Sequence, residues 1–192
     1  MHMVDKNMFA RLRKELAAQD AMREEVIKDS RGILKSAKQA IYAVHRGDTT
    51  KAERLLKSAA TQLARLSKKK GSESIGALGD AQEEYVEARL YLAFAQDKPL
   101  PTPQTLRVGA ERYLAGVCDL VGELVRAGIN ASIKEDYASA KHIKDFVARI
   151  YEELLQFDFR NSSLRRKFDA TKYGLDKLED LVYDLKLRGK LS

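Results

Sequence analysis

The chain has 192 residues, enough to bury one substantial core but too few for two ordinary domains, and we therefore predict a single domain over residues 1–192. Hydrophobic residues make up 44% and charged residues 33% of the chain, with only 3 prolines, a composition typical of helix-rich proteins that excludes a disordered chain. Lysine and arginine outnumber aspartate and glutamate by 35 to 28, and the net charge of +7 favours polyanionic partners such as nucleic acid or an anionic membrane surface.

The helical spacing of apolar residues predicts an all-α bundle of six or seven helices, and no segment shows the alternation typical of a strand. The first helix is expected from about Asp5 to Arg46, either continuous or broken near Ser30–Gly32. The other expected helices run from Asp48 or Thr49 to Gly71, from about Asp80 to Gln96, from Pro103 to about Gly128, from about Tyr137 to Phe157 and from Ser162 to Arg188. The last of these carries a heptad seam, which indicates self-association: Leu164, Phe168, Thr171, Leu175, Leu178, Val182 and Leu185.

Cysteine and hydropathy patterns bear on the compartment. Cys118 is the only cysteine, so an internal disulfide and a cysteine metal cage are excluded, and a reducing cytoplasmic setting is expected. The longest apolar run, Leu90–Ala95, is far shorter than the roughly 20 residues of a membrane-spanning helix, and no signal peptide is expected. Residues 1–4 are expected to be disordered or to carry a cloning remnant.

Several classes of enzyme lack their sequence motifs here. The three histidines His2, His45 and His142 lie far apart and form neither HExxH nor Glu-x-x-His, which excludes zinc hydrolases and di-iron bundles of the ferritin type. There is no GxxxxGK[ST] and no GxSxG, so P-loop phosphoryl transfer and serine hydrolysis have no support. Chemistry in this chain would therefore rest on carboxylates.

Two pairs of acids stand out. Glu84 and Glu87 share one face of the third expected helix, in an acidic segment where no Lys or Arg follows at i+4. Asp119 and Glu123 share one face of the next helix, and Gly116 and Gly122 would permit a close approach between the two helices. If the pairs face each other, four carboxylates could bind one or two Mg²⁺ or Mn²⁺ ions and support phosphodiester hydrolysis. Spacing alone leaves a second interpretation open, in which both pairs lie on solvent-facing sides of amphipathic helices.

Basic and aromatic residues could supply the nucleic-acid side of such a site. Phosphates bind basic clusters such as Lys68–Lys70, Arg165–Lys167 and Lys186–Lys190 without reading the sequence of bases. The tyrosines Tyr85, Tyr91 and Tyr113 lie near the acid pairs in sequence and could stack on unpaired bases, although aromatics at helical spacing are more often core. The candidate nucleic-acid-binding residues are Arg11, Arg13, Lys14, Lys68, Lys69, Lys70, Arg112 and Arg126.

Several segments resemble the translin family: Ala18–Asp20 with Arg23–Glu25, Tyr113–Val117 with Glu123–Leu124, Asn161–Asp169, Lys172–Tyr173, and Val182–Leu185 with Arg188–Gly189. The resemblance runs from about Gln19 to Gly189. Glu84–Ala88 (EYVEA) and Asp119–Leu124 (DLVGEL) resemble translin-associated factor X, the endoribonuclease member, whereas translin has an apolar residue where this chain has Asp119. The acid set with a translin-like VYDL ending suggests a compact, archaeal-type member of the family.

The resemblance implies a translin-like bundle that assembles into a hollow homo-oligomer, commonly an octamer, with contacts from the C-terminal helix. It also implies that Glu84, Glu87, Asp119 and Glu123 are both catalytic and metal-binding. The leading hypothesis is a Mg²⁺- or Mn²⁺-dependent endoribonuclease that cleaves single-stranded RNA inside this shell. The alternatives are a non-catalytic binder of single-stranded DNA or RNA, of translin type, and an assembly scaffold without a nucleic-acid role.

Overall fold

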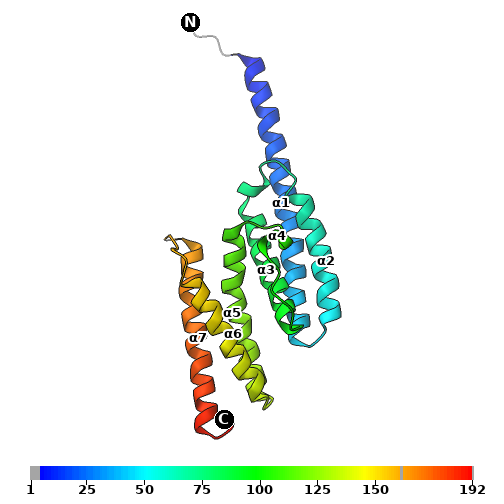
Figure 1. Cartoon of the computed structure of the whole chain (residues 1–192). Coiled ribbons are helices and arrows are strands. Elements are labelled where there is room, and N and C mark those ends of the chain that lie inside the picture. The colour runs from blue at the N-terminus through cyan, green and yellow to red at the C-terminus, as the bar shows by residue number, and fades with distance from the viewer. Residues whose placement is uncertain (1–4, 161, 192) are drawn as a thin grey trace.

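The computed structural model describes residues 5–160 and 162–191. Residues 1–4, for which disorder or a cloning remnant is expected, lie outside this part, as does Asn161, which opens the Asn161–Asp169 motif. The described residues form seven α-helices, one 3₁₀ turn and no strand, which confirms the predicted all-α fold. The elements in chain order are α1 (Lys6–His45), α2 (Thr49–Leu66), η1 (Ser72–Ser74), α3 (Gly76–Ala95), α4 (Pro103–Leu106), α5 (Ala110–Ile133), α6 (Tyr137–Leu154) and α7 (Ser163–Leu187) (Figure 1).

Side-chain caps begin several of these helices where the sequence predicts them. The carboxylate of Asp5 accepts hydrogen bonds from the backbone N–H groups of Asn7 and Met8, and Asp48 caps α2 in the same way through Lys51 N. The α1 helix continues without a break through Ser30–Gly32. One reason is that Ser30 and Ile33 are buried there, so that packing holds the helix continuous.

Several predicted helix boundaries are wrong. The helix expected from Pro103 to Gly128 is two helices, because Arg107 adopts a left-handed backbone with φ of 56° and ends α4 after one turn. The loop expected over Gly71–Gly79 begins and ends earlier in the chain, because α2 ends at Leu66 and α3 begins at Gly76. Between them the buried hydroxyl of Ser72 donates to the carbonyl oxygen of Leu66 and fixes the 3₁₀ turn.

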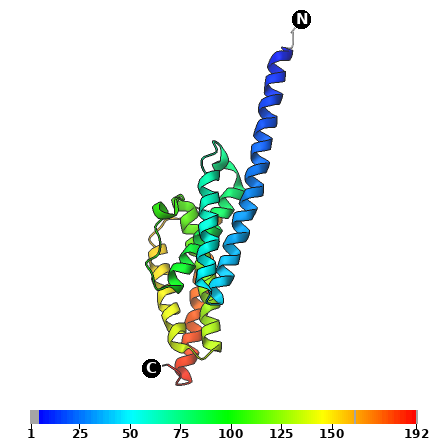
Figure 2. The same ribbon diagram turned by 90° about the vertical axis from the view of Figure 1, so that its right-hand side faces the viewer.

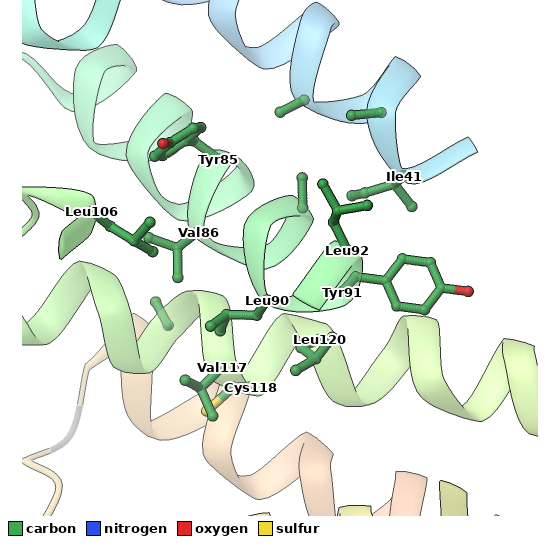
Figure 3. Close-up of a cluster of buried hydrophobic side chains, with 14 of the residues drawn as sticks. Ile41, Tyr85, Val86, Leu90, Tyr91, Leu92, Leu106, Val117, Cys118 and Leu120 are labelled. Atoms are coloured by element: carbon green, nitrogen blue, oxygen red, sulfur yellow. The ribbon is translucent and has the colours of Figure 1, made fainter. Parts of the chain in front are cut away.

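The helices pack in two groups that meet along α3 and α5. Helices α1, α2 and α3 lie together on one side and α5, α6 and α7 on the other (Figure 1). One continuous apolar cluster joins both groups, and burial of this surface is the main stabilising contribution to the fold. Its central part includes Leu90 and Leu92 from α3 and Leu120 from α5 (Figure 3). Cys118 lies in this cluster as a buried core residue, and burial raises the pKa of its thiol to about 12.

The first half of α1 leaves the bundle. The helix is about 60 Å long at the usual rise per residue, and its residues 6–21 are exposed along their whole length and project beyond the other helices (Figure 2). Burial begins at Val26. The projecting half carries an exposed apolar stripe formed by Met8, Phe9, Leu12 and Leu16.

The heptad seam of α7 is buried inside this chain. All seven seam residues, from Leu164 to Leu185, are buried where α7 packs against α5 and α6. The seam therefore does not itself support self-association, because a helix that buries its apolar stripe in its own bundle has the same periodicity as one that dimerises. No helix in the described part of the chain has the length and apolar character needed to cross a membrane.

Candidate functional site

A close crossing of α3 and α5 brings the two acid pairs together. A Cβ atom added at Gly116 would lie 2.6 Å from Val86 Cγ1 and 2.9 Å from the carbonyl oxygen of Glu83, so only glycine permits this approach. Gly122 does not have the expected role, because a Cβ there would have nothing within 4 Å. It instead forms part of the wall of a cavity beside the crossing.

All four predicted carboxylates line one cavity of about 590 Å³. Glu84 and Glu87 reach it from α3, and Asp119 and Glu123 reach it from α5. The cavity is closed on two further sides by α1 and α7, which contribute Lys38, Tyr42, Lys167 and Thr171 among others. The interpretation of both acid pairs as fully solvent-facing therefore does not hold for this chain.

Basic side chains lie beside three of the four acids. Lys38 Nζ lies 3.9 Å from Glu84 Oε2, and Arg126 Nη1 lies 3.8 Å from Glu123 Oε2. Lys167 donates to the carboxylate of Asp119 and also to Glu83 Oε2, at 3.0 Å for the second bond. The cavity therefore holds both signs of charge, as a site for a phosphate beside carboxylates requires.

His45 holds Glu123 in place. The carboxylate of Glu123 can only accept, so His45 Nε2 carries the proton and donates to Glu123 Oε2. In the neutral ring Nδ1 then accepts from the hydroxyl of Tyr91 at 3.0 Å. Tyr91 reaches out of the apolar cluster with its hydroxyl at the far end (Figure 3). The chain Tyr91–His45–Glu123 thus fixes the orientation of one acid.

The pKa values of the four carboxylates separate according to their partners. Burial raises the pKa of Glu84, of Asp119 and above all of Glu87, and charges of neighbouring carboxylates add to the shift for Glu84 and Glu87. The pKa of Glu87 reaches about 8. The hydrogen bond from His45 instead lowers the pKa of Glu123. Burial is thus the main reason why the pKa of Glu87 is raised, and the neighbouring carboxylates Glu84, Asp119 and Glu123 add to the shift.

This shift at Glu87 predicts a specific pH dependence of stability. Its pKa is about 8 in the folded chain against an ordinary value of 4.5, so between these values the folded state keeps a proton that the unfolded state has lost. The free energy of unfolding therefore falls as pH rises through this range, by up to about 1.4 kcal/mol per pH unit from this group. Glu87→Gln, which is neutral at every pH, removes this contribution. Urea unfolding in EDTA at about pH 5 and pH 8 measures the difference.

The expected result is that Glu87→Gln gains stability relative to the natural chain as pH rises. The matched control is Glu111→Gln, an exposed glutamate of the same bundle without an ion-pair partner among the described residues, which should leave the pH dependence unchanged. If the curves of Glu87→Gln and the natural chain run parallel, Glu87 does not hold a proton in the folded state.

The donor chemistry of the cavity fits a hard divalent ion such as Mg²⁺ or Mn²⁺. Four carboxylates line the same space, and Glu87 is only 8% exposed and has no hydrogen bond or ion pair with any described residue. No three His, Cys, Asp or Glu side chains of the described residues already converge on one ion position. An ion would have to compete with Lys167 for Asp119 and with His45 for Glu123.

The structure scatters the basic residues predicted to bind nucleic acid. Arg126 alone among them lines the cavity. Arg112 pairs with Glu83, and Lys69 pairs with Glu25. Lys68 and Lys70 are exposed at the end of α2, and the other three lie on the projecting half of α1: Arg11, Arg13 and Lys14.

The three tyrosines proposed to stack on bases have structural roles instead. Tyr85 and Tyr91 are buried in the core, and Tyr113 donates its hydroxyl proton to the carbonyl oxygen of Pro101 at 3.0 Å. Sequence reasoning in turn missed Lys38, Tyr42 and His45. The only signal available for them was their position within the buried half of α1, because residues from four helices line the cavity and no spacing rule relates them.

The fold and the cavity define a class: an all-α bundle in which two crossing helices present acid pairs to a space bordered by basic side chains. A model of the Translin family matches residues 21–189, and the chain belongs to that family. The resemblance seen in the sequence is thereby confirmed.

Curated relatives span nearly the whole chain. An uncharacterized protein of Methanocaldococcus jannaschii is 31% identical over 92% of this chain and 84% of its own. Mouse translin is 26% identical over 95% of this chain and 92% of its own. Translin-associated protein X of Pongo abelii is 26% identical over 94% of this chain and 78% of its own.

Solved structures share the fold. The crystal structure of AfC3PO has a TM-score of 0.85 and 28% identity, covering 94% of this chain and 98% of that one. A structure of the AfC3PO complex with duplex RNA has a TM-score of 0.83 and 27% identity, covering 94% of this chain and 97% of that one.

Proposed function

We propose that this protein is a Mg²⁺- or Mn²⁺-dependent endoribonuclease that cleaves single-stranded RNA within a homo-oligomeric, octameric shell. The observation that carries the proposal is the convergence of Glu84, Glu87, Asp119 and Glu123 on one cavity that Lys38, Arg126 and Lys167 border. The family and the RNA complex of AfC3PO support an RNA substrate.

Each side chain has a role that its position suggests. The four carboxylates would hold the metal, which supplies Lewis-acid stabilisation of the phosphate and activation of water. Lys38 and Arg126 bind the phosphate from the α1 and α5 sides, where their present partners lie 3.9 Å and 3.8 Å away. The hydrogen bond from His45, which is itself oriented by Tyr91, holds the carboxylate of Glu123 in place beside the cavity.

The proposal of an oligomeric shell is supported by membership of the family and by one exposed surface of this chain. The exposed apolar stripe of Met8, Phe9, Leu12 and Leu16 lies on a helical segment that no other part of the described chain covers. A second copy of the chain is the proposed partner of this stripe, since packing would remove its apolar surface from water.

Cleavage of an end-labelled single-stranded RNA tests the proposed function. The natural chain is expected to shorten the RNA with Mg²⁺ or Mn²⁺ and to leave it intact in EDTA. The double variant Glu84→Gln/Glu87→Gln, purified in the same way, is expected to leave the RNA intact with metal present, which also excludes a contaminating nuclease. A duplex of the same sequence, the form bound in the AfC3PO complex, tests the preference for single strands.

Cleavage that survives in the double variant would overturn the assignment of the site. RNA that is bound with a steep salt dependence but stays intact with every metal would instead support a translin-like binder without catalysis. That second function is favoured by the ion pair of Lys167 with Asp119 and the hydrogen bond of His45 to Glu123, which occupy two of the four carboxylates.

A further inference from the structure

Tyr42 is an exposed aromatic side chain at the edge of the acid-lined cavity. It lies on α1 between Lys38 and His45 and is 49% exposed, whereas the tyrosines of α3 are buried. The ring forms part of the wall of the cavity that contains the four carboxylates. Because the Tyr42 side chain stays in contact with water beside a charged cavity, packing of the core does not account for its position.

Arg126 holds this ring from one side. Its guanidinium carbon lies 5.3 Å from the centroid of the Tyr42 ring, a cation–π contact that joins α5 to α1 across the cavity. Arg126 also lies 3.8 Å from Glu123, so the tyrosine is linked through one side chain to the carboxylates. The contact restricts the ring, and its exposed surface is a preformed platform for a flat ligand.

A second hollow also has Tyr42 in its lining and contains none of the four carboxylates. It has a volume of about 300 Å³ and is lined by Gln39, Tyr42, Ala43, Arg46, Asp48 and Lys51. Arg46 and Lys51 are exposed and have no ion-pair partner among the described residues. Asp48 is engaged as the cap of α2, where it accepts from Lys51 N, and the two cations leave the hollow with an excess positive charge.

We propose that Tyr42 and this hollow form a nucleotide subsite next to the carboxylates, in which an unpaired base stacks on Tyr42 and the adjoining phosphate binds Arg46 and Lys51. Tyr42 lines both cavities. A base stacked on Tyr42 would therefore lie between two phosphates of the strand, one at the carboxylates and the next in the hollow. The subsite rests on the proposed RNA substrate and deepens it: a base engaged in a duplex cannot present its face to the ring, so the nucleotide held here is single-stranded.

Binding of an RNA with one 2-aminopurine, measured in EDTA where the proposed cleavage does not occur, tests the subsite. Tyr42→Ala is expected to weaken binding of the single strand roughly tenfold and to abolish the quenching of the stacked 2-aminopurine, whereas Tyr42→Phe keeps both. Arg46→Gln/Lys51→Gln is expected to weaken binding and to reduce the slope of log K against log salt by roughly 0.7 for one phosphate. The matched control is Lys134→Gln/Lys177→Gln, two exposed lysines outside both cavities, which should keep the 2-aminopurine quenching.

Equal affinity and equal quenching in Tyr42→Ala and the natural chain would overturn the subsite. So would an equal loss of affinity for single strand and duplex on Tyr42 substitution, because stacking on an unpaired base discriminates between them. These outcomes can be distinguished from a failure of the proposed catalysis. If cleavage depends on metal and on Glu84 and Glu87 while Tyr42→Ala changes neither affinity nor quenching, the proposed nuclease is retained and only the subsite is rejected.

Discussion

Glu123→Gln is expected to lower the rate of RNA cleavage by at least about a hundredfold. The carboxylate of Glu123 lines the cavity in its charged form, since the hydrogen bond from His45 lowers its pKa. Glutamine keeps the size and can still accept from His45 Nε2, but it removes the negative charge that a divalent ion needs. Loss of one charged ligand costs several kcal/mol of transition-state stabilisation, and each 1.4 kcal/mol is about tenfold in rate. Single-turnover cleavage of labelled RNA measures the effect.

The control for this substitution is Glu111→Gln, which removes a carboxylate from the exposed first turn of the same helix α5. It should cleave at the natural rate. Circular dichroism and light scattering should show the same helicity and mass for both variants. A Glu123→Gln protein that is folded, assembled and fully active would refute the assignment of the carboxylate site.

Gly116→Ala is expected to lower the free energy of unfolding by roughly 1–3 kcal/mol, the usual cost of overpacking a close contact. The added Cβ would lie 2.6 Å from Val86 Cγ1 and 2.9 Å from the backbone oxygen of Glu83, and the second contact cannot be relieved by a side-chain rotation. Helix α3 must therefore move away from α5, which also separates Glu84 and Glu87 from Asp119 and Glu123. Denaturant unfolding measures the loss of stability, and the cleavage assay should show a lower rate.

Gly122→Ala provides the matched comparison on the same helix. A Cβ at Gly122 meets nothing within 4 Å, and replacing a helical glycine by alanine usually stabilises by roughly 0.5–1 kcal/mol. The two substitutions should thus change stability in opposite directions. A similar effect of both would mean that α3 and α5 are not locked together at Gly116.

The sequence predicted the helices well where local chemistry decides them. Asp5 and Asp48 cap the helices that they were expected to begin, and the apolar seam of α7 is buried as a stripe. The sequence failed at Arg107, because a left-handed residue that is not glycine has no signature in periodicity. It also failed on the partner of the α7 seam, since periodicity shows that a stripe is buried but not against which helix.

The acids of the site, Arg126 and the close approach at Gly116 were accessible from sequence, and the contacts that join distant residues were not. Glu84 with Glu87, and Asp119 with Glu123, are neighbours on their own helices, so spacing and family resemblance both point to them. The contact of His45 with Glu123 joins residues 78 positions apart, and Lys167 meets Asp119 across 48 positions. Such pairs depend on how α1 packs against α3 and how α7 packs against α5, which no local pattern encodes. Gly116 was found for the right reason, whereas Gly122 matched the same reasoning without the contact.

In a single copy of the chain, the half of α1 that leaves the bundle is held helical only by hydrogen bonds within the segment itself and by its cap Asp5. Isolated helical segments of this length are marginal in water. The amide protons of residues 6–21 are therefore expected to exchange with solvent through the opening of single turns, while those near Val26 and Ile33 exchange only when the bundle opens. Protection of the amide protons from exchange should thus increase along this helix toward the bundle. A partner that covers Met8 to Leu16 would make the protection uniform along its length.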